Sequence, residues 1–163
     1  MMTPLQRYSL LFFLLLHIPT SLLVDFQALG LGVHSDALHG MNQWYYDLAK
    51  DFLMSDPPIW FKSLIGAELL LQVPYHICAS YALLKGEPSF NWIRIPTIMW
   101  GAHTATTLIP ILGELIYSDK ATESTRWILV SLYTPYMVIP AYFMMVLAMD
   151  PHPFGLPTGK KLR

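Results

Sequence analysis

The chain has 163 residues, of which 54% are hydrophobic and 13% are charged, and its formal net charge is -1. Soluble domains carry about a quarter charged residues, so this composition indicates a membrane protein. The near-neutral charge, without a basic patch, argues against nucleic acid as a partner. The one cysteine, Cys78, excludes a disulfide framework and a cysteine-based zinc site, and its apolar surroundings predict a small buried side chain.

Four apolar segments are long enough to cross a bilayer, which takes roughly 20 predominantly apolar residues. They predict an all-α membrane protein, a four-transmembrane-helix bundle that forms one domain over residues 1–163. The predicted spans are 8–29, 60–84, 93–117 and 127–149. Arg7 before the first span would also suit a cleaved signal peptide. His17 and Pro19 interrupt that apolar run, however, and no small-residue cleavage pattern follows Asp25, which favours a retained span.

Basic residues set the predicted orientation. Six lie on the side of the two termini and the middle loop, and four lie opposite, which predicts cytosolic termini and a cytosolic tail over 150–163. The chain ends in KKLR, so Lys160 and Lys161 match the dilysine signal that returns membrane proteins to the endoplasmic reticulum. The alternative is an ordinary basic tail. The pattern favours a multi-pass protein of the endoplasmic reticulum membrane.

A predicted lumenal helix lies between the first two spans. The segment NQWYYDLAKDFLM (42–54) has apolar residues at helical spacing. It is expected to lie across the mouth of the bundle or in the membrane interface. The pair Pro57 and Pro58 ends it.

Polar side chains of all four spans fall at overlapping depths when counted at 1.5 Å per residue from the lumenal ends. They are Asp25, Glu68, Gln72, Thr107, His103, Tyr133 and Tyr136. Burying them apart from one another would be expensive, so they are expected to converge. Their mixture of aromatic and polar groups suits an apolar ligand with one polar or charged group.

Prolines inside the spans can kink the helices, because each one removes a backbone hydrogen bond. They are Pro19, Pro74, Pro110, Pro135 and Pro140. Kinks in several helices would splay the bundle and open a cavity. The alternative is bent packing without a cavity.

Asp25 and Glu68 form the most informative pair. If the two carboxyl groups lie within a few ångströms in low dielectric, one should hold a proton, and we expect a neutral Glu68 beside a charged Asp25. A carboxylate among aromatic rings suits a protonated amine. The alternative is a hydrogen bond that only ties the first two spans together. Histidines at different depths without a ligand motif predict no metal site, and no cofactor motif is present.

Several phrases resemble the sigma-2 branch of the EXPERA superfamily, to which a sterol Δ8–Δ7 isomerase also belongs. They include HIPTSLLVDFQAL (17–29), ELLLQVPY (68–75), HTATTLIPIL (103–112) and VSLYTPYMVIP (130–140). The resemblance implies a bundle of EXPERA type in the endoplasmic reticulum membrane, with a pocket reached laterally from the bilayer. It leaves the nuclear membrane open as a further location.

The resemblance also implies roles for single residues. Asp25 would pair with the cationic amine of a ligand, Glu68 would hydrogen-bond to Asp25, and Asp51 would hold the lumenal loop in place. The other implied ligand-binding residues are Gln72, Thr107, Tyr136, Tyr133, His17, Tyr45, Phe61 and Trp100. Trp100 stands where the family usually has tyrosine, Glu114 has no counterpart, and the 30–41 loop departs from the family pattern.

These observations predict an intracellular membrane receptor that binds sterols or oxysterols and lipophilic cationic amines without chemistry. By resemblance it would serve cholesterol homeostasis and trafficking with the lysosomal Niemann–Pick C transporter, and a homodimer is left open. One alternative is a sterol isomerase that uses Asp25 and Glu68 as acid and base. Another is a scaffold with a vestigial pocket.

Overall fold

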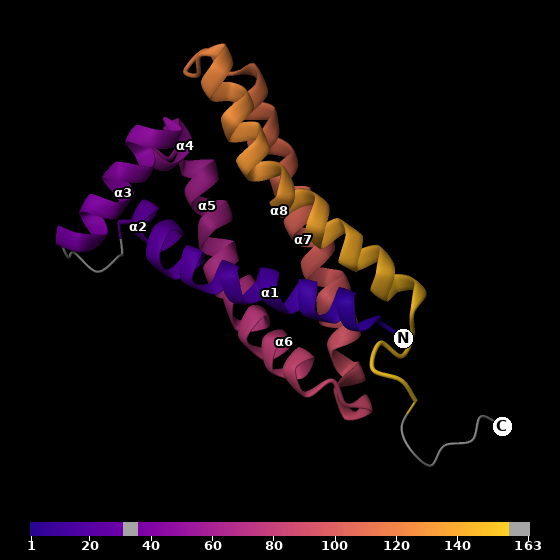
Figure 1. Cartoon of the computed structure of the whole chain (residues 1–163). Helices are drawn as coiled ribbons and strands as arrows, with labels where there is room; N and C mark the ends of the chain where they lie inside the picture. Colours follow the sequence, from indigo (N-terminus) through magenta and orange to yellow (C-terminus); the bar gives the residue numbers. More distant parts are fainter. Residues whose placement is uncertain (31–35, 157–163) are drawn as a thin grey trace.

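The computed structural model describes residues 1–30 and 36–156, and every regular element in these residues is helical (Figure 1). The first half holds α1 (Pro4–Thr20), the π-helical turn η1 (Ser21–Asp25), α2 (Phe26–Ala28), α3 (Asp36–Ala49) and α4 (Phe52–Ser55). The second half holds α5 (Ile59–Ala67), the π-helical turn η2 (Glu68–Gln72), α6 (Val73–Lys85), the 3-10 turn η3 (Pro88–Ile93), α7 (Arg94–Tyr117) and α8 (Glu123–Met149). The predicted all-α fold is confirmed.

Two helical stretches, Pro4–Ala28 and Glu123–Met149, are long and apolar enough to cross a membrane. The other two predicted spans correspond to the α5–η2–α6 stretch and to α7. That all four cross the bilayer stays a prediction, and so does kinking. Pro19, Pro110, Pro135 and Pro140 do lie inside helices, and Pro74 lies in the first turn of α6.

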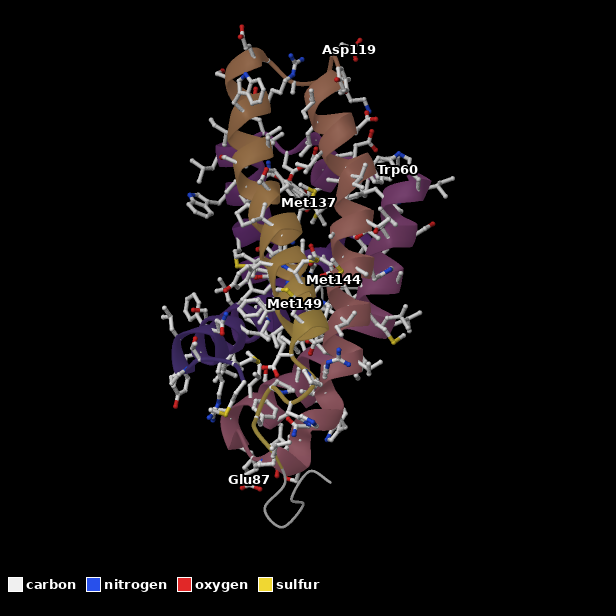
Figure 2. All side chains as sticks on the ribbon, turned by 90° about the vertical axis from the view of Figure 1, so that its right-hand side faces the viewer. Trp60, Glu87, Asp119, Met137, Met144 and Met149 are labelled. Carbon is white, nitrogen blue, oxygen red and sulfur yellow. The ribbon has the colours of Figure 1, made fainter. Side chains whose placement is uncertain are left out.

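Helices α7 and α8 run side by side over most of their length (Figure 1). Gly101 lets them approach closely, because a Cβ atom there would lie 2.6 Å from the Pro140 carbonyl oxygen and 2.7 Å from Met144 Cβ. Their connection carries Asp119 at one end of the molecule, while Glu87 lies at the opposite end (Figure 2).

Two apolar clusters form the core. The first joins α1, α6, α7 and α8 and includes Leu10, Leu14, Leu83, Phe143 and Leu147. The second joins α4, α5, α7 and α8 and includes Leu53, Phe61, Ile65, Leu115 and Leu129. Tyr136 packs against both clusters, which places it between the two halves of the core.

Arginine side chains close two helix ends at the Glu87 end of the molecule. Arg7 donates to the carbonyl oxygens of Leu83 (2.5 Å) and Leu84 (2.9 Å) at the end of α6. Arg94 donates to the Leu147 carbonyl oxygen (2.8 Å) near the end of α8. Cations at helix C-termini are stabilising because they meet unpaired carbonyl groups and the negative end of the dipole.

The N-terminus and the start of the C-terminal tail lie together. The Met1 ammonium group lies 2.5 Å from Asp150 Oδ2, and the Met2 backbone N–H donates to the Pro153 carbonyl at 3.0 Å. Asn91 in η3 donates to the Gly155 carbonyl at 2.7 Å. The N-terminus and residues 150–155 are therefore on one side of the bundle. Lys160 and Lys161 lie outside the described residues, as do residues 31–35 of the loop.

Two local features differ from the expectations. In place of one helix over 42–54 there are two, α3 and α4, because Lys50 takes a left-handed backbone (φ 53°) and Asp51 caps the start of α4. The predicted burial of Cys78 is wrong, since this side chain is exposed. In a membrane protein the outer surface is as apolar as the core, so the apolar sequence around Cys78 did not distinguish a buried side chain from an exposed one.

Candidate functional site

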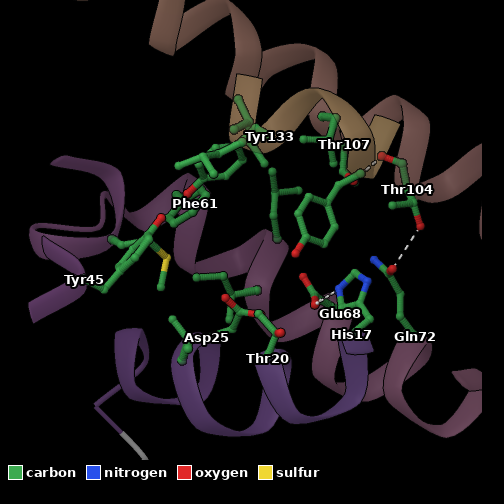
Figure 3. Close-up of a pocket in the computed structure, with 18 residues that line it drawn as sticks. His17, Thr20, Asp25, Tyr45, Phe61, Glu68, Gln72, Thr104, Thr107 and Tyr133 are labelled. Carbon is green, nitrogen blue, oxygen red and sulfur yellow. Dashed lines mark hydrogen bonds and ion pairs between the residues drawn. The ribbon is translucent and has the colours of Figure 1, made fainter. Parts of the chain in front are cut away.

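A cavity of about 320 Å³ lies between the two clusters and is bordered by α1, η1, α3, α5, η2, α7 and α8 (Figure 3). Nine of the ten predicted ligand-binding residues line it. They are His17, Asp25, Tyr45, Phe61, Glu68, Gln72, Thr107, Tyr133 and Tyr136. Residues from all four predicted spans and from the loop helix are thus brought to one place.

Trp100 is the predicted site residue that does not line the cavity. Its side chain is 4% exposed and stacks on Tyr75, with ring centroids 5.2 Å apart. The reason is that this turn of α7 faces α6, whereas Thr104 and Thr107, further along α7, face the cavity.

The acidic wall of the cavity is carried by the two π-helical turns, which contact each other. Glu68 Oε1 accepts from the Ser21 hydroxyl at 2.5 Å and lies 2.9 Å from His17 Nε2. Asp25 lines the same cavity as Glu68 and lies on η1, the turn that contacts η2. Such π-helical turns are frequent at functional sites, and here each one contributes a carboxyl group.

The hydrogen-bonding side chains Ser21 and His17 both contact Glu68. A hydroxyl donor and an imidazole both stabilise an ionised carboxylate. Within the described part of the chain, Asp25 forms no ion pair with a basic side chain. The arrangement therefore favours an ionised Glu68 and a protonated Asp25, which is the opposite of the assignment expected from sequence. Spacing could not reveal this, because the partner His17 lies on a different helix from Glu68.

On the far side of the cavity from Tyr45 and Tyr133, the uncharged polar side chains of Gln72, Thr104 and Thr107 lie near His17 and Glu68 (Figure 3). The Thr104 hydroxyl donates to Gln72 Oε1 at 2.9 Å, and the Thr107 hydroxyl donates to the Thr104 carbonyl at 2.9 Å. Sequence reasoning missed Thr104 and also Thr20, which lines the wall near Asp25. The signal for Thr104 was its position three residues before Thr107, on the same helix face.

Asp51 lies outside the cavity lining but positions two residues that line it. Its Oδ2 atom accepts from the hydroxyls of Tyr45 and Tyr133, each at 2.8 Å. Its Oδ1 atom accepts from the backbone N–H groups of Leu53 and Met54, each at 3.1 Å. Burial, and then the charge of Asp51, raise the pKa of Tyr45, so its hydroxyl stays a donor. Asp51 thus ties the α3–α4 segment to α8.

His76, His103 and His152 lie off the cavity lining. His76 is 0% exposed and its ring centroid lies 4.7 Å from that of His17. Neither of its ring nitrogens, nor His103 Nε2, has a hydrogen-bond partner among the described residues. No cluster of three or more His, Cys, Asp or Glu in residues 1–30 and 36–156 is arranged to hold a metal ion. Glu114 is half-buried on α7, away from the cavity.

In the residues that the structure describes, helices, two of them long and apolar enough to cross a membrane, surround an internal cavity lined by apolar and acidic groups, which defines a class of helical membrane protein with an internal cavity. The chain belongs to the EXPERA family, the expanded EBP superfamily, whose model matches residues 37–147. The resemblance noted in the sequence is thereby confirmed.

Three relatives carry the name sigma intracellular receptor 2. The protein of Xenopus tropicalis is 37% identical over 156 residues, which cover 90% of each chain. The protein of Homo sapiens is 38% identical over 152 residues, covering 86% of this chain and 85% of the relative. The protein of Macaca fascicularis is 37% identical over 152 residues, with the same coverage.

Proposed function

We propose that this protein is a sigma-2-type intracellular membrane receptor whose cavity binds lipophilic cationic amines and sterols or oxysterols. The observation that carries the proposal is the acidic wall of Asp25 and Glu68 in a cavity that no lysine or arginine of residues 1–30 and 36–156 lines. The names of the relatives support the receptor class.

The cavity chemistry supports this choice of ligand. Aromatic rings of Tyr45, Phe61, Tyr133 and Tyr136 border the space beside the carboxyl groups, and such rings attract a cation further. Leucine, isoleucine, valine and methionine side chains form most of the remaining lining, which suits an apolar ligand body. The hydroxyl of a sterol would find partners at Gln72 and Thr107.

The cellular setting is proposed on separate grounds. Four crossings with both termini in the cytosol are supported by the contact between the N-terminus and the tail. Location in the endoplasmic reticulum membrane rests on Lys160 and Lys161. A role in cholesterol homeostasis and trafficking, the Niemann–Pick C partner and a homodimer rest on the family resemblance alone.

A sterol isomerase is the alternative, and the His17–Glu68 pair beside Asp25 favours it as a second candidate. Isomerisation needs an acid to protonate a ring double bond and a base to remove a proton elsewhere. This wall of the cavity holds both kinds of group. Turnover of a Δ8-sterol by purified protein, followed by chromatography, separates an isomerase from a receptor.

The proposal is tested by binding of a labelled lipophilic tertiary amine to membranes that contain the protein. Asp25→Asn removes one partner of a buried charge pair, which should cost about 2–5 kcal/mol and hence at least roughly thirtyfold in affinity. The matched control is Asp47→Asn, which changes an exposed carboxylate on α3. Equal binding by wild type and Asp25→Asn would remove Asp25 from the site. Absence of binding to wild type would refute the receptor proposal.

A further inference from the structure

Two carboxyl groups line the cavity, those of Asp25 and Glu68, and the side-chain contacts with Ser21 and His17 gather at Glu68. Glu68 Oε1 receives the Ser21 hydroxyl at 2.5 Å and lies 2.9 Å from His17 Nε2. Asp25 lines the same cavity as Glu68 and lies four residues after Ser21 on η1, the turn that contacts η2. Two adjacent carboxylates in an apolar cavity repel each other strongly, so one retains a proton.

The surroundings of Asp25 decide which carboxyl group this is. The titratable groups that face it are Glu68 from η2, His17 from α1, Asp51 from the α3–α4 connection and the three cavity tyrosines. The tyrosines are Tyr45, Tyr133 and Tyr136. Among the cavity-lining groups His17 is the one base, and it is paired with Glu68. The proton therefore belongs on Asp25.

We propose that Asp25 is protonated in the empty cavity and that binding of a lipophilic cation releases this proton. The Asp25 O–H bond breaks, the proton passes to water, and the remaining carboxylate pairs with the cation. No oxidation or reduction is involved. This inference rests on the proposed receptor function and adds a chemical rule for its ligands.

The rule separates two ligand classes that share the cavity. A cation exchanges for a proton, so its affinity should rise about tenfold per pH unit while Asp25 is protonated in the empty cavity and the ligand keeps its charge. A neutral hydroxylated sterol leaves the Asp25 proton in place as a hydrogen-bond donor, so its affinity should not change with pH. Lower pH therefore weakens the binding of amines and leaves the binding of neutral ligands unchanged.

Isothermal titration calorimetry of the full chain in detergent, in two buffers with different ionisation enthalpies, counts the released protons. The probes are a lipophilic tertiary amine, its N-methylated quaternary analogue and a hydroxylated sterol. We expect about one proton released per cation bound and none for the sterol. Release by the quaternary analogue shows that the proton comes from the protein, because this ligand has none to give.

The outcomes separate the two proposals. Binding of both cations without proton release would overturn this inference and leave the receptor function standing. If neither the cations nor the sterol binds, the receptor function itself fails, and this inference fails with it.

Infrared difference spectroscopy places the proton without depending on affinity. The carbonyl stretch of a protonated carboxyl group should be present in the empty wild-type protein and disappear when the quaternary ligand is added. It should be absent from Asp25→Asn, and a band that persists in Asp25→Asn would put the proton on another group and overturn the assignment.

Discussion

Asp51 permits a sharp test of how the α3–α4 segment is held against the bundle. Both tyrosine hydroxyls, from Tyr45 and Tyr133, donate to the same oxygen of a side chain that is 1% exposed. Tyr45→Phe and Tyr133→Phe each remove one donor and leave the other in place. The double variant leaves that buried carboxylate oxygen without its two hydroxyl donors.

The magnitude follows from the charge of the acceptor. A hydrogen bond to a charged group contributes about 1.5–3 kcal/mol, so each single variant should lower the free energy of unfolding by that amount. For a chain of this length 1 kcal/mol corresponds to about 2–4 °C in Tm, which gives roughly 3–12 °C per single variant. Removing the last side-chain partner of a buried charge costs about 3–5 kcal/mol, so the double variant should lose more than the sum of the singles.

Thermal unfolding in a single detergent, followed by circular dichroism, measures all three variants. Tyr142→Phe is the control, because its half-exposed hydroxyl accepts only from Gln6 among the described residues. This control should change stability by less than about 0.5 kcal/mol. A double variant that loses only the sum of the two single losses, or less, would show that Tyr45 and Tyr133 do not act through one shared oxygen.

Three further variants test other parts of the structure. Gly101→Ala should lower Tm at a cost of about 1–3 kcal/mol, because its Cβ atom would overlap α8; an unchanged Tm would contradict the close α7–α8 contact. His76→Phe should leave Tm unchanged or raise it, because neither ring nitrogen has a partner to lose in the described structure; a clear loss in Tm would reveal a hidden hydrogen bond. Partial burial opposes ionisation of Asp150, but the Met1 ammonium group and a backbone N–H lower its pKa. The contribution of this pair, below about 1 kcal/mol, should be present above pH 3.8 and be lost as pH falls further. Tail proteolysis should then be faster for Asp150→Asn than for wild type at pH 7, and equal rates would argue against the pair.

Much of the helical framework could be predicted from apolar length alone. The span expected over 93–117 appears as Arg94–Tyr117, and the one expected over 127–149 appears within Glu123–Met149. Such ranges are readable because a bilayer-spanning helix needs a long apolar stretch. The convergence of polar residues from several helices was also predictable in outline, since each is expensive to bury by itself.

What the sequence could not provide are the features that depend on neighbours. A hydrophobicity pattern that assumes 3.6 residues per turn throughout does not reveal the two π-helical turns. Trp100 lies on the same face of α7 as Thr104 and Thr107, yet it stacks on Tyr75 because α7 packs against α6 at that turn. The proton on Asp25 follows from His17 and Ser21 reaching Glu68, and no spacing within one helix shows that contact.

The π-helical turn η2 helps to set which side chains of the α5–η2–α6 stretch face the cavity. A π-helical turn accommodates one more residue than an α-helical turn, and one residue corresponds to about 100° of rotation in a regular α-helix. Glu68 lines the cavity and pairs with His17, and His76, eight residues later, is off the cavity lining with its ring centroid 4.7 Å from that of His17. Deleting a single residue between 68 and 72 would turn all of α6 relative to α1, whereas a substitution there alters one side chain. This stretch should tolerate changes of residue type far better than changes of length.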